Sequence, residues 1–343
     1  MKILIIRFSS LGDIILLFPA IQAIRQNMPD SEIHVLTKEA YREVFCGSSL
    51  VDKVISIEND SGFCDLIRTV TALNRFRYSH IIDMHKSIRS ILMSLFLKKE
   101  KISRLKKYTV RKYLTARTRY NFMKNVPDIV TRYKNTIKIP AIPNEKPPQH
   151  ISNIFDRPAV SIPQINNKTP LAAICPGSRW ECKTWGVDNY SSLAVMLVQK
   201  GLGIVLLGSF AEKDLCASIK EYAEKNGAPD SVQNFSGKLN IEQNFHVLKQ
   251  CSLAVSNDSG LAHLAAAADI PVNIIFGPTT PSMGFVPPGK VATFEKRELY
   301  CRPCTSVGRN KCPEKHFRCM NEIKPKNVFE VIFTPDYAAK REA

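Results

Sequence analysis

The stretch "VSNDSGLAHLAAAA", from Val255 to Ala268, places polar residues between an apolar run and an alanine-rich run. Asp258, Ser259 and Gly260 stand where a strand is expected to pass into a helix. Unpaired N–H groups and the helix dipole attract anions such as phosphate to a helix N-terminus, and His263 follows one turn later. A helix cap explains the same Asp or Ser without any ligand, so both interpretations stay open at this point.

Two further apolar runs in the second half also end in polar loops. "CPGSRWECKTWGVDNY" contains Ser178 and Lys183, and a lysine supplies a point charge to a diphosphate. "LLGSFAEKD" contains Glu212, an acid that can accept hydrogen bonds from ribose hydroxyls. A surface lysine and a first-turn glutamate are each common alone, but three such loops on one sheet favour a nucleotide site. The chain has no GxGxxG and no Walker motif, which disfavours standard dinucleotide and P-loop sites.

The first half contains a comparable pair of loops. Asp13, in "RFSSLGDIILLFPAI", is either a first-turn acid favoured by the helix dipole or a general base. "DMHKSIRS" brings Asp83, His85 and Arg89 to the same side of the predicted sheet. The basic groups there are suited to an anionic acceptor.

The elements that must position these loops alternate along the chain. Apolar runs predict strands at 2–8, 32–37, 53–57 and 80–85. The alternation resumes in segments 171–178, 203–209, 253–260 and 271–282, in each of which an apolar run ends in a loop rich in Gly, Ser, Thr or Pro. Amphipathic segments predict helices at 13–28, 189–199, 213–225, 242–250 and 324–332, the last expected to brace the first domain. This order predicts an α/β protein with parallel, doubly wound sheets that bind ligands at the carboxyl ends of their strands.

Length and composition predict the domain limits and the cellular location of the protein. A chain of 343 residues exceeds one usual core, and seven prolines within residues 139–170 mark a linker. The predicted domains are 1–150, 151–325 and a C-terminal helix and tail at 326–343. No apolar run approaches the length of a membrane span, and Arg7 and Asp13 interrupt any signal peptide, so we expect a cytoplasmic protein.

The net charge of +17 is concentrated in one stretch. Residues 98–138 contain fourteen Lys or Arg and two acids, together with several aromatic residues. A solvated helix face normally mixes both signs, so this stretch favours an anionic partner such as a membrane surface, a glycolipid or nucleic acid.

Four cysteines gather near the C-terminus in "CRPCTSVGRNKCPEKHFRC". A CxxC followed by two more cysteines is compatible with structural zinc, but the second pair is six residues apart rather than two. Two interpretations therefore stay open for Cys301, Cys304, Cys312 and Cys319: a structural zinc site, or reduced or redox-labile thiols.

Several motifs carry a resemblance to a known family: the opening "MKILIIRFSSLGDIILLFPAIQAIR", "PGSRWECKTWGVDNY", "NDSGLAHLAAA" with "IFGPTTPS", and "CRPC…CPEKHFRCMNEIKP". Together they resemble glycosyltransferase family 9, the ADP-heptose:lipopolysaccharide heptosyltransferases, and the cysteine-bearing tail is most similar to the heptosyltransferase II branch. The resemblance spans nearly the whole chain, with few matching positions between residues 62 and 170 beyond "DMHKSIRS".

The resemblance implies a GT-B enzyme whose two Rossmann-like domains face a cleft, with the acceptor on the N-terminal domain and the ADP-sugar on the C-terminal one. It implies an inverting reaction with Asp13 as general base, no metal at the active site and no cofactor besides the donor. The implied donor-binding residues are Ser178, Lys183, Glu212, Asp258, Ser259, Gly260, His263 and Thr279. The acceptor-binding residues are expected to be Ser9, Ser10, Asp83, His85 and Arg89.

The expected function is transfer of heptose from ADP-heptose to the anionic inner core of lipopolysaccharide. The expected location is the cytoplasmic face of the inner membrane, contacted through residues 98–138, with no nucleic-acid partner. A family relative that uses another nucleotide-sugar or glycan acceptor is one alternative. A basic nucleic-acid-binding protein is an alternative of a different class, disfavoured because the basic stretch matches no DNA-binding motif.

Overall fold

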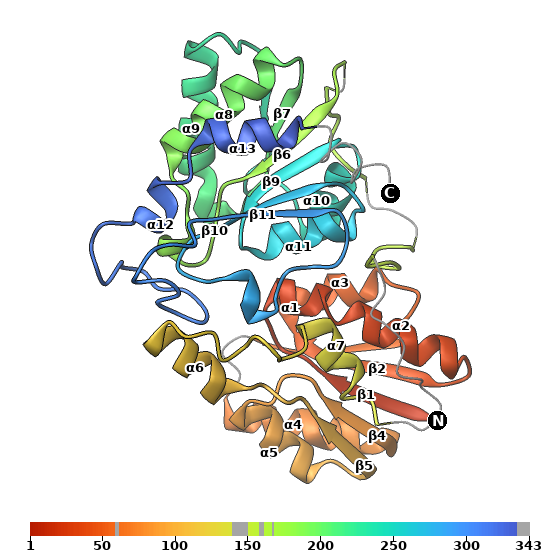
Figure 1. Cartoon of the computed structure of the whole chain (residues 1–343). Helices are drawn as coiled ribbons and strands as arrows, with labels where there is room; N and C mark the ends of the chain where they lie inside the picture. Colours follow the sequence, from red (N-terminus) through yellow and green to blue (C-terminus); the bar gives the residue numbers. More distant parts are fainter. Residues whose placement is uncertain (59–61, 139–149, 158–160, 167, 335–343) are drawn as a thin grey trace. The chain divides into compact units, whose positions relative to one another are not determined.

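The computed structural model describes residues 1–58, 62–138, 150–157, 161–166 and 168–334. Its contacts divide the chain into two compact units (Figure 1). The first unit takes Met1–Tyr108 and Pro127–Ala159, and the second takes Thr109–Val126 and Val160–Ala343. The sequence-based domain limits at 150 and 325 stay predictions about folding domains.

The first unit contains a five-stranded parallel sheet in the order β3-β2-β1-β4-β5. Its strands are β1 (Lys2–Ile6), β2 (Glu32–Lys38), β3 (Lys53–Ile57), β4 (Tyr78–Asp83) and β5 (Lys99–Arg104). The unit's helices are α1 (Leu11–Ile15), α2 (Phe18–Asn27), α3 (Arg42–Cys46), α4 (Phe63–Leu73), α5 (Ile88–Phe96) and α7 (Ile129–Lys134). The central β1 is buried from Ile3 to Ile6 because helices cover both faces of a parallel sheet.

The second unit contains a six-stranded parallel sheet in the order β11-β10-β9-β6-β7-β8. Its strands are β6 (Leu171–Cys175), β7 (Gly203–Leu206), β8 (Val232–Asn234), β9 (Leu253–Asn257), β10 (Val272–Phe276) and β11 (Val291–Glu295). Its helices are α6 (Thr109–Thr118), α8 (Val187–Gln199), α9 (Lys213–Lys225), α10 (Ile241–Leu248), α11 (Gly260–Ala267), α12 (Arg318–Asn321) and α13 (Pro325–Ile332). The predicted α/β class with parallel sheets and helices is confirmed.

Each sheet reverses its strand order once, which leaves a crevice at the carboxyl ends of the two strands beside the reversal. In the first sheet these strands are β1 and β4, which pair in parallel. In the second sheet they are β6 and β9. Most of the loops that carry the predicted site residues leave these four strands. Glu212 and Thr279 follow the neighbouring strands β7 and β10 instead.

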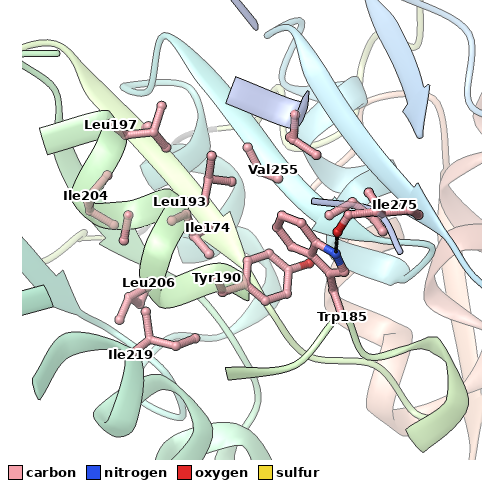
Figure 2. Close-up of a cluster of buried hydrophobic side chains, with 14 of the residues drawn as sticks. Ile174, Trp185, Tyr190, Leu193, Leu197, Ile204, Leu206, Ile219, Val255 and Ile275 are labelled. Carbon is pink, nitrogen blue, oxygen red and sulfur yellow. Dashed lines mark hydrogen bonds between the residues drawn. The ribbon is translucent and has the colours of Figure 1, made fainter. Parts of the chain in front are cut away.

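The core of the second unit forms around Trp185, which is 1% exposed (Figure 2). Its indole Nε1 donates to the Ile323 carbonyl at 2.8 Å, and its ring packs edge-on against Tyr190 with centroids 5.0 Å apart. Leu193 and Leu197 of α8 pack in the same cluster. The loop after β6 is therefore anchored in the core directly beyond Lys183.

One helix prediction was wrong in detail. The single helix predicted over 13–28 is two helices, because Pro19 lies in the first turn of α2, where its missing N–H costs nothing. The predicted C-terminal helix exists as α13, and it packs against α8 of its own unit, where Val328 and Ile332 join the core. The expectation that it also braces the first domain stays a prediction.

Candidate active site

The loops after β6, β9 and β10 bring three predicted donor residues together. Lys183 lies at the end of a short 3₁₀ turn, Glu181–Lys183, and its Nζ is 2.6 Å from Oδ2 of Asp258. The hydroxyl of Thr279 donates to the same Oδ2 at 2.9 Å. These residues are up to 96 positions apart in the chain (279 − 183), so the sheet places them and not local sequence.

The Lys183–Asp258 pair is largely removed from water. The two side chains are 11% and 13% exposed. Burial by itself would raise the pKa of Asp258, but the charge of Lys183 and its hydrogen bond outweigh burial, so the pKa is lowered. The site therefore holds an ionised carboxylate that fixes the position of a lysine.

The N-terminus of α11 is arranged as an anion site requires. Ser259 is the N-cap residue with extended backbone (φ −142°, ψ 173°), and among the described residues its side chain makes no capping hydrogen bond. Its Oγ lies 3.2 Å from Oγ of Ser256 instead. Gly260 begins the helix, and the buried His263 lies on its second turn, close enough to Asp258 to help lower the pKa of that carboxyl. The N–H groups of the first turn thus receive no side-chain cap, which favours the anion interpretation over the cap alone.

Glu212 lies beside the loop that contains Ser178. A Cβ on Gly177 would come within 1.8 Å of Glu212 Oε1, so only glycine leaves room for this carboxylate. Glu212 Oε2 accepts a hydrogen bond from the Ser209 N–H, and Ser178 Oγ accepts one from the Trp180 N–H at 3.4 Å. The sheet thus brings the second and third predicted polar loops to one edge.

Two residues that the sequence analysis missed hold these loops in place. Asn257 accepts hydrogen bonds from the Trp185 N–H at 3.1 Å and the Tyr190 hydroxyl at 2.9 Å, and donates to the Pro176 carbonyl at 2.6 Å. Arg302 donates to the Gly277 and Thr279 carbonyls, at 2.5 Å and 2.7 Å, and pairs with Glu295 at 2.8 Å. Asn257 was detectable as the polar residue that ends an apolar strand. Arg302 lies within the cysteine motif, and nothing in that motif indicates that its side chain contacts the Thr279 loop.

In the first unit, Asp13 lies in a cluster of polar partners at the end of β1. Its Oδ2 is 2.7 Å from a guanidinium nitrogen of Arg7 and accepts from the Ser10 hydroxyl at 2.9 Å. The Tyr133 hydroxyl donates to Oδ1 at 3.4 Å. The Asp13 side chain remains 19% exposed, whereas Arg7 and Tyr133 are buried. Arg7 was missed in the sequence, although an arginine that ends an apolar strand is itself a signal.

The second predicted loop of this unit follows β4 and is organised by Asp83. This fully buried carboxylate accepts from the backbone N–H groups of His85 and Lys86, at 3.0 Å and 2.7 Å, and from the Ser90 hydroxyl at 3.0 Å. Asp83 therefore shapes the turn that presents His85. Ser9, Ser10 and Arg89 lie in or next to the same two loops and are at least partly exposed.

His85 is neutral rather than cationic at neutral pH. Burial, followed by the charges of Arg7 and Lys107, lowers its pKa to about 3. Its ring packs edge-on against Phe8, with centroids 5.0 Å apart. Positive charge at this edge comes instead from Arg7 and Lys107, although burial also lowers the pKa of Lys107.

The lowered pKa of His85 predicts an acid-dependent loss of stability. The unfolded chain binds a proton at its His85 near pH 6.5, whereas the folded chain binds it only near pH 3. The free energy of unfolding should therefore decrease as the pH falls from about 6.5 toward 3. Urea titrations at pH 7.5 and 5.0 should show a smaller decrease for His85→Gln than for the wild type. The exposed His150 gives the control, and equal pH dependence of His85→Gln and wild type would contradict the assignment.

All ten cysteines are free thiols. Cys301, Cys304, Cys312 and Cys319 line one pocket with Cys182 and His316, and burial raises the pKa of Cys319 to about 12. Within the described residues, no group of three or more His, Cys, Asp or Glu side chains is arranged to hold a metal. The zinc prediction therefore finds no support.

Solved structures identify the fold to which these sheets and loops belong. The structure of E. coli ADP-heptose lps heptosyltransferase II matches with a TM-score of 0.72 at 21% identity over 100% of both chains. E. coli heptosyltransferase WaaC with ADP-2-deoxy-2-fluoro heptose matches with a TM-score of 0.70 at 19% identity, over 97% of this chain and 99% of that one. The fold is therefore GT-B, a fold of glycosyltransferases. The family model of glycosyltransferase family 9 (heptosyltransferase) matches residues 66–335, and the chain belongs to this family.

A curated relative extends the match over nearly the full length. Lipooligosaccharide heptosyltransferase 2 of Haemophilus ducreyi is 26% identical over 358 residues, which cover 97% of this chain and 98% of the relative. The resemblance to the heptosyltransferase II branch is thus confirmed. The expectation of a glycosyltransferase is confirmed as well.

Proposed function

We propose that this glycosyltransferase moves heptose from ADP-heptose to the inner core of lipopolysaccharide, with inversion at the anomeric carbon. The observation that carries the proposal is the meeting of Lys183, Asp258 and Thr279 beside the uncapped N-terminus of α11. A WaaC structure with a fluorinated ADP-heptose and a relative named lipooligosaccharide heptosyltransferase 2 support this donor and this class of acceptor.

On the donor side, negative charge develops on the diphosphate as the bond to the anomeric carbon breaks. Lys183, held by Asp258, and the N–H groups at Ser259 and Gly260 stabilise that charge. Glu212 accepts hydrogen bonds from the ribose, and Ser178, His263 and Thr279 complete the donor site. ADP leaves as the new glycosidic bond forms on the opposite face of the sugar.

On the acceptor side, Asp13 takes the proton from the attacking hydroxyl. Arg7 favours the ionised carboxylate that a base requires, and Ser10 and Tyr133 orient it. Ser9, Ser10, His85 and Arg89 contact the acceptor, and Lys107 adds positive charge. Because Asp83 is fully buried, we propose that it positions His85 instead of contacting the acceptor.

The proposal also locates the reaction at the cytoplasmic face of the inner membrane, where a lipid-linked acceptor is met. Among the described residues, no helix has both the length and the apolar character to cross a bilayer. We propose that contact with the membrane is made at the surface of the protein.

Mass spectrometry of defined acceptors tests the function directly. Incubation with ADP-heptose and a heptose-deficient, phosphorylated core acceptor should add one heptose to the acceptor and release one ADP. Omitting either substrate should abolish the ADP signal, and EDTA should leave the rate unchanged. Heptose addition only with another nucleotide-sugar, or only to another glycan, would overturn the proposal.

A further inference from the structure

Helix α5 exposes an apolar face to the solvent and buries serines on its inner face. Ile88, Leu92, Leu95 and Phe96 recur at the spacing of one helix face, and they are 80%, 41%, 59% and 71% exposed. Two serines, Ser90 and Ser94, face inward and are fully buried. A helix that meets only water would place these residues the other way round.

Hydrogen bonds satisfy the hydroxyl groups of both buried serines, so the fold itself holds the serines inward and the apolar side chains outward. Ser90 Oγ donates to Asp83 Oδ2 at 3.0 Å, and Ser94 Oγ donates to the Ile91 carbonyl at 2.8 Å. Arg104 donates to Ser94 Oγ at 2.9 Å. Met93 on the inner face and Leu97 directly after the helix join the core of the first unit. Figure 1 shows α5 beside α4 on the outside of this sheet.

Positive charge surrounds this apolar face. Between Lys86 and Lys107 the chain has eight Lys or Arg and one acid, Glu100. Lys98 follows Leu97 at the end of α5, and Lys101 and Arg104 lie exposed on β5, an edge strand of the sheet. An exposed apolar helix face flanked by cations is the pattern of helices that lie in the surface of an anionic bilayer.

We propose that α5 docks the protein on an anionic lipid bilayer, with Ile88, Leu92, Leu95 and Phe96 entering the interface and the flanking lysines contacting lipid phosphates. The inference deepens the proposed function, since a lipid-linked acceptor is reached from a membrane surface. The docking surface shares only the first part of the basic stretch expected from the sequence, with Lys98, Lys101 and Arg104. Its apolar helix α5 precedes residue 98, and residues 109–126 of the stretch belong to the second unit.

Co-sedimentation of the full-length protein with vesicles tests the docking surface. The probes are vesicles of phosphatidylcholine alone and of phosphatidylcholine with phosphatidylglycerol. We expect binding to the anionic vesicles, weaker binding to the neutral ones, and loss of binding as salt is added. The triple variant Leu92→Gln, Leu95→Gln, Phe96→Gln should lower the partition coefficient by about tenfold or more.

Matched variants distinguish binding through this surface from nonspecific binding of vesicles to exposed apolar residues elsewhere on the protein. Tyr222→Gln and Val331→Gln change apolar residues that are 43% and 38% exposed on helices of the second unit, and they should bind vesicles as the wild type does. Lys98→Gln with Lys101→Gln should weaken binding to anionic vesicles and leave binding to neutral ones unchanged. Wild-type vesicle binding by the triple variant overturns the proposal. Conversion of a wild-type dimer to a monomer by the triple variant, with vesicle binding unchanged, also overturns it and assigns the face to a second copy.

Transfer to a water-soluble acceptor without lipid keeps the two proposals distinguishable. The triple variant should transfer heptose to this acceptor at the wild-type rate, because none of its changes lies in the proposed active site. Loss of vesicle binding with unchanged soluble transfer supports docking by α5. Absence of soluble transfer in the wild type itself would count against the proposed function, whatever the vesicles show.

Discussion

Asp13→Asn is expected to lower kcat for heptose transfer by about a hundredfold to ten-thousandfold, the usual contribution of a general base. Asparagine keeps the shape of the side chain but cannot accept the proton of the acceptor hydroxyl. Because Asp13 belongs to the first unit and the proposed donor residues to the second, ADP should bind the variant as it binds the wild type. Steady-state ADP release measures the rate, and calorimetric titration with ADP measures donor-site binding.

Stability must be measured in the same experiment, because Asp13 is also the ion-pair partner of the buried Arg7. Leaving a buried charge without its partner destabilises a protein by about 3–5 kcal/mol, so the rate should be measured well below the melting temperature of the variant. Asp128→Asn is the matched control: Asp128 caps α7 in the same unit through Thr131 and has no proposed role in transfer. Wild-type turnover by a folded Asp13→Asn enzyme would refute the base assignment.

The sequence singled out the candidate site residues whose signal is local. Asp258, Ser259 and Gly260 were chosen because a strand, a polar turn and a helix follow one another within fifteen residues, and each has its own periodicity. Lys183 and Glu212 were chosen by the same pattern. Parallel strands end at one edge of a sheet, so the expectation that these loops meet followed from topology alone, and the structure brings them together.

The partners of these residues could not be predicted, because they come from distant parts of the chain. Tyr133 lies 120 positions from Asp13, and Asn257 lies 72 positions from Trp185. No periodicity connects such pairs; only the packing of helices on the sheet does. The orientation of α5 was hidden for a related reason. No helix was predicted over its residues, and which of its faces meets the core depends on Asp83 and Arg104, which bond the inward serines.

The residues and the family resemblance carry different parts of the functional conclusion. Lysine, helix N–H groups and a carboxylate at one sheet edge are suited by their chemistry to a diphosphate and a ribose, and on this the proposed donor site rests. Heptose itself is not defined by any of these groups, since none of them distinguishes one hexose-like ring from another. The choice of sugar therefore depends on the relatives, and the choice of chemistry on this chain's own geometry.

Lys183→Met is expected to reduce kcat/KM by about a hundredfold to a thousandfold, as removal of a group that stabilises transition-state charge does. ADP affinity should fall by about tenfold to a hundredfold, because a charge-assisted contact to phosphate is lost. The same change leaves Asp258 ionised and largely buried without its cation, so the second unit should also lose stability. Lys220→Met, which breaks only a surface pair with Glu224, should change none of these quantities.

Adding Asp258→Asn to Lys183→Met separates the two roles of the lysine. The double variant no longer buries an unpaired charge, so its melting temperature should recover toward that of the wild type. Its kcat/KM should stay low, because the positive charge that faces the diphosphate is still missing. If transfer recovered together with stability, Lys183 would be a structural partner of Asp258 and the helix N-terminus alone would hold the diphosphate. Low transfer in a restored fold would instead identify the lysine charge as the group on which the departing ADP depends.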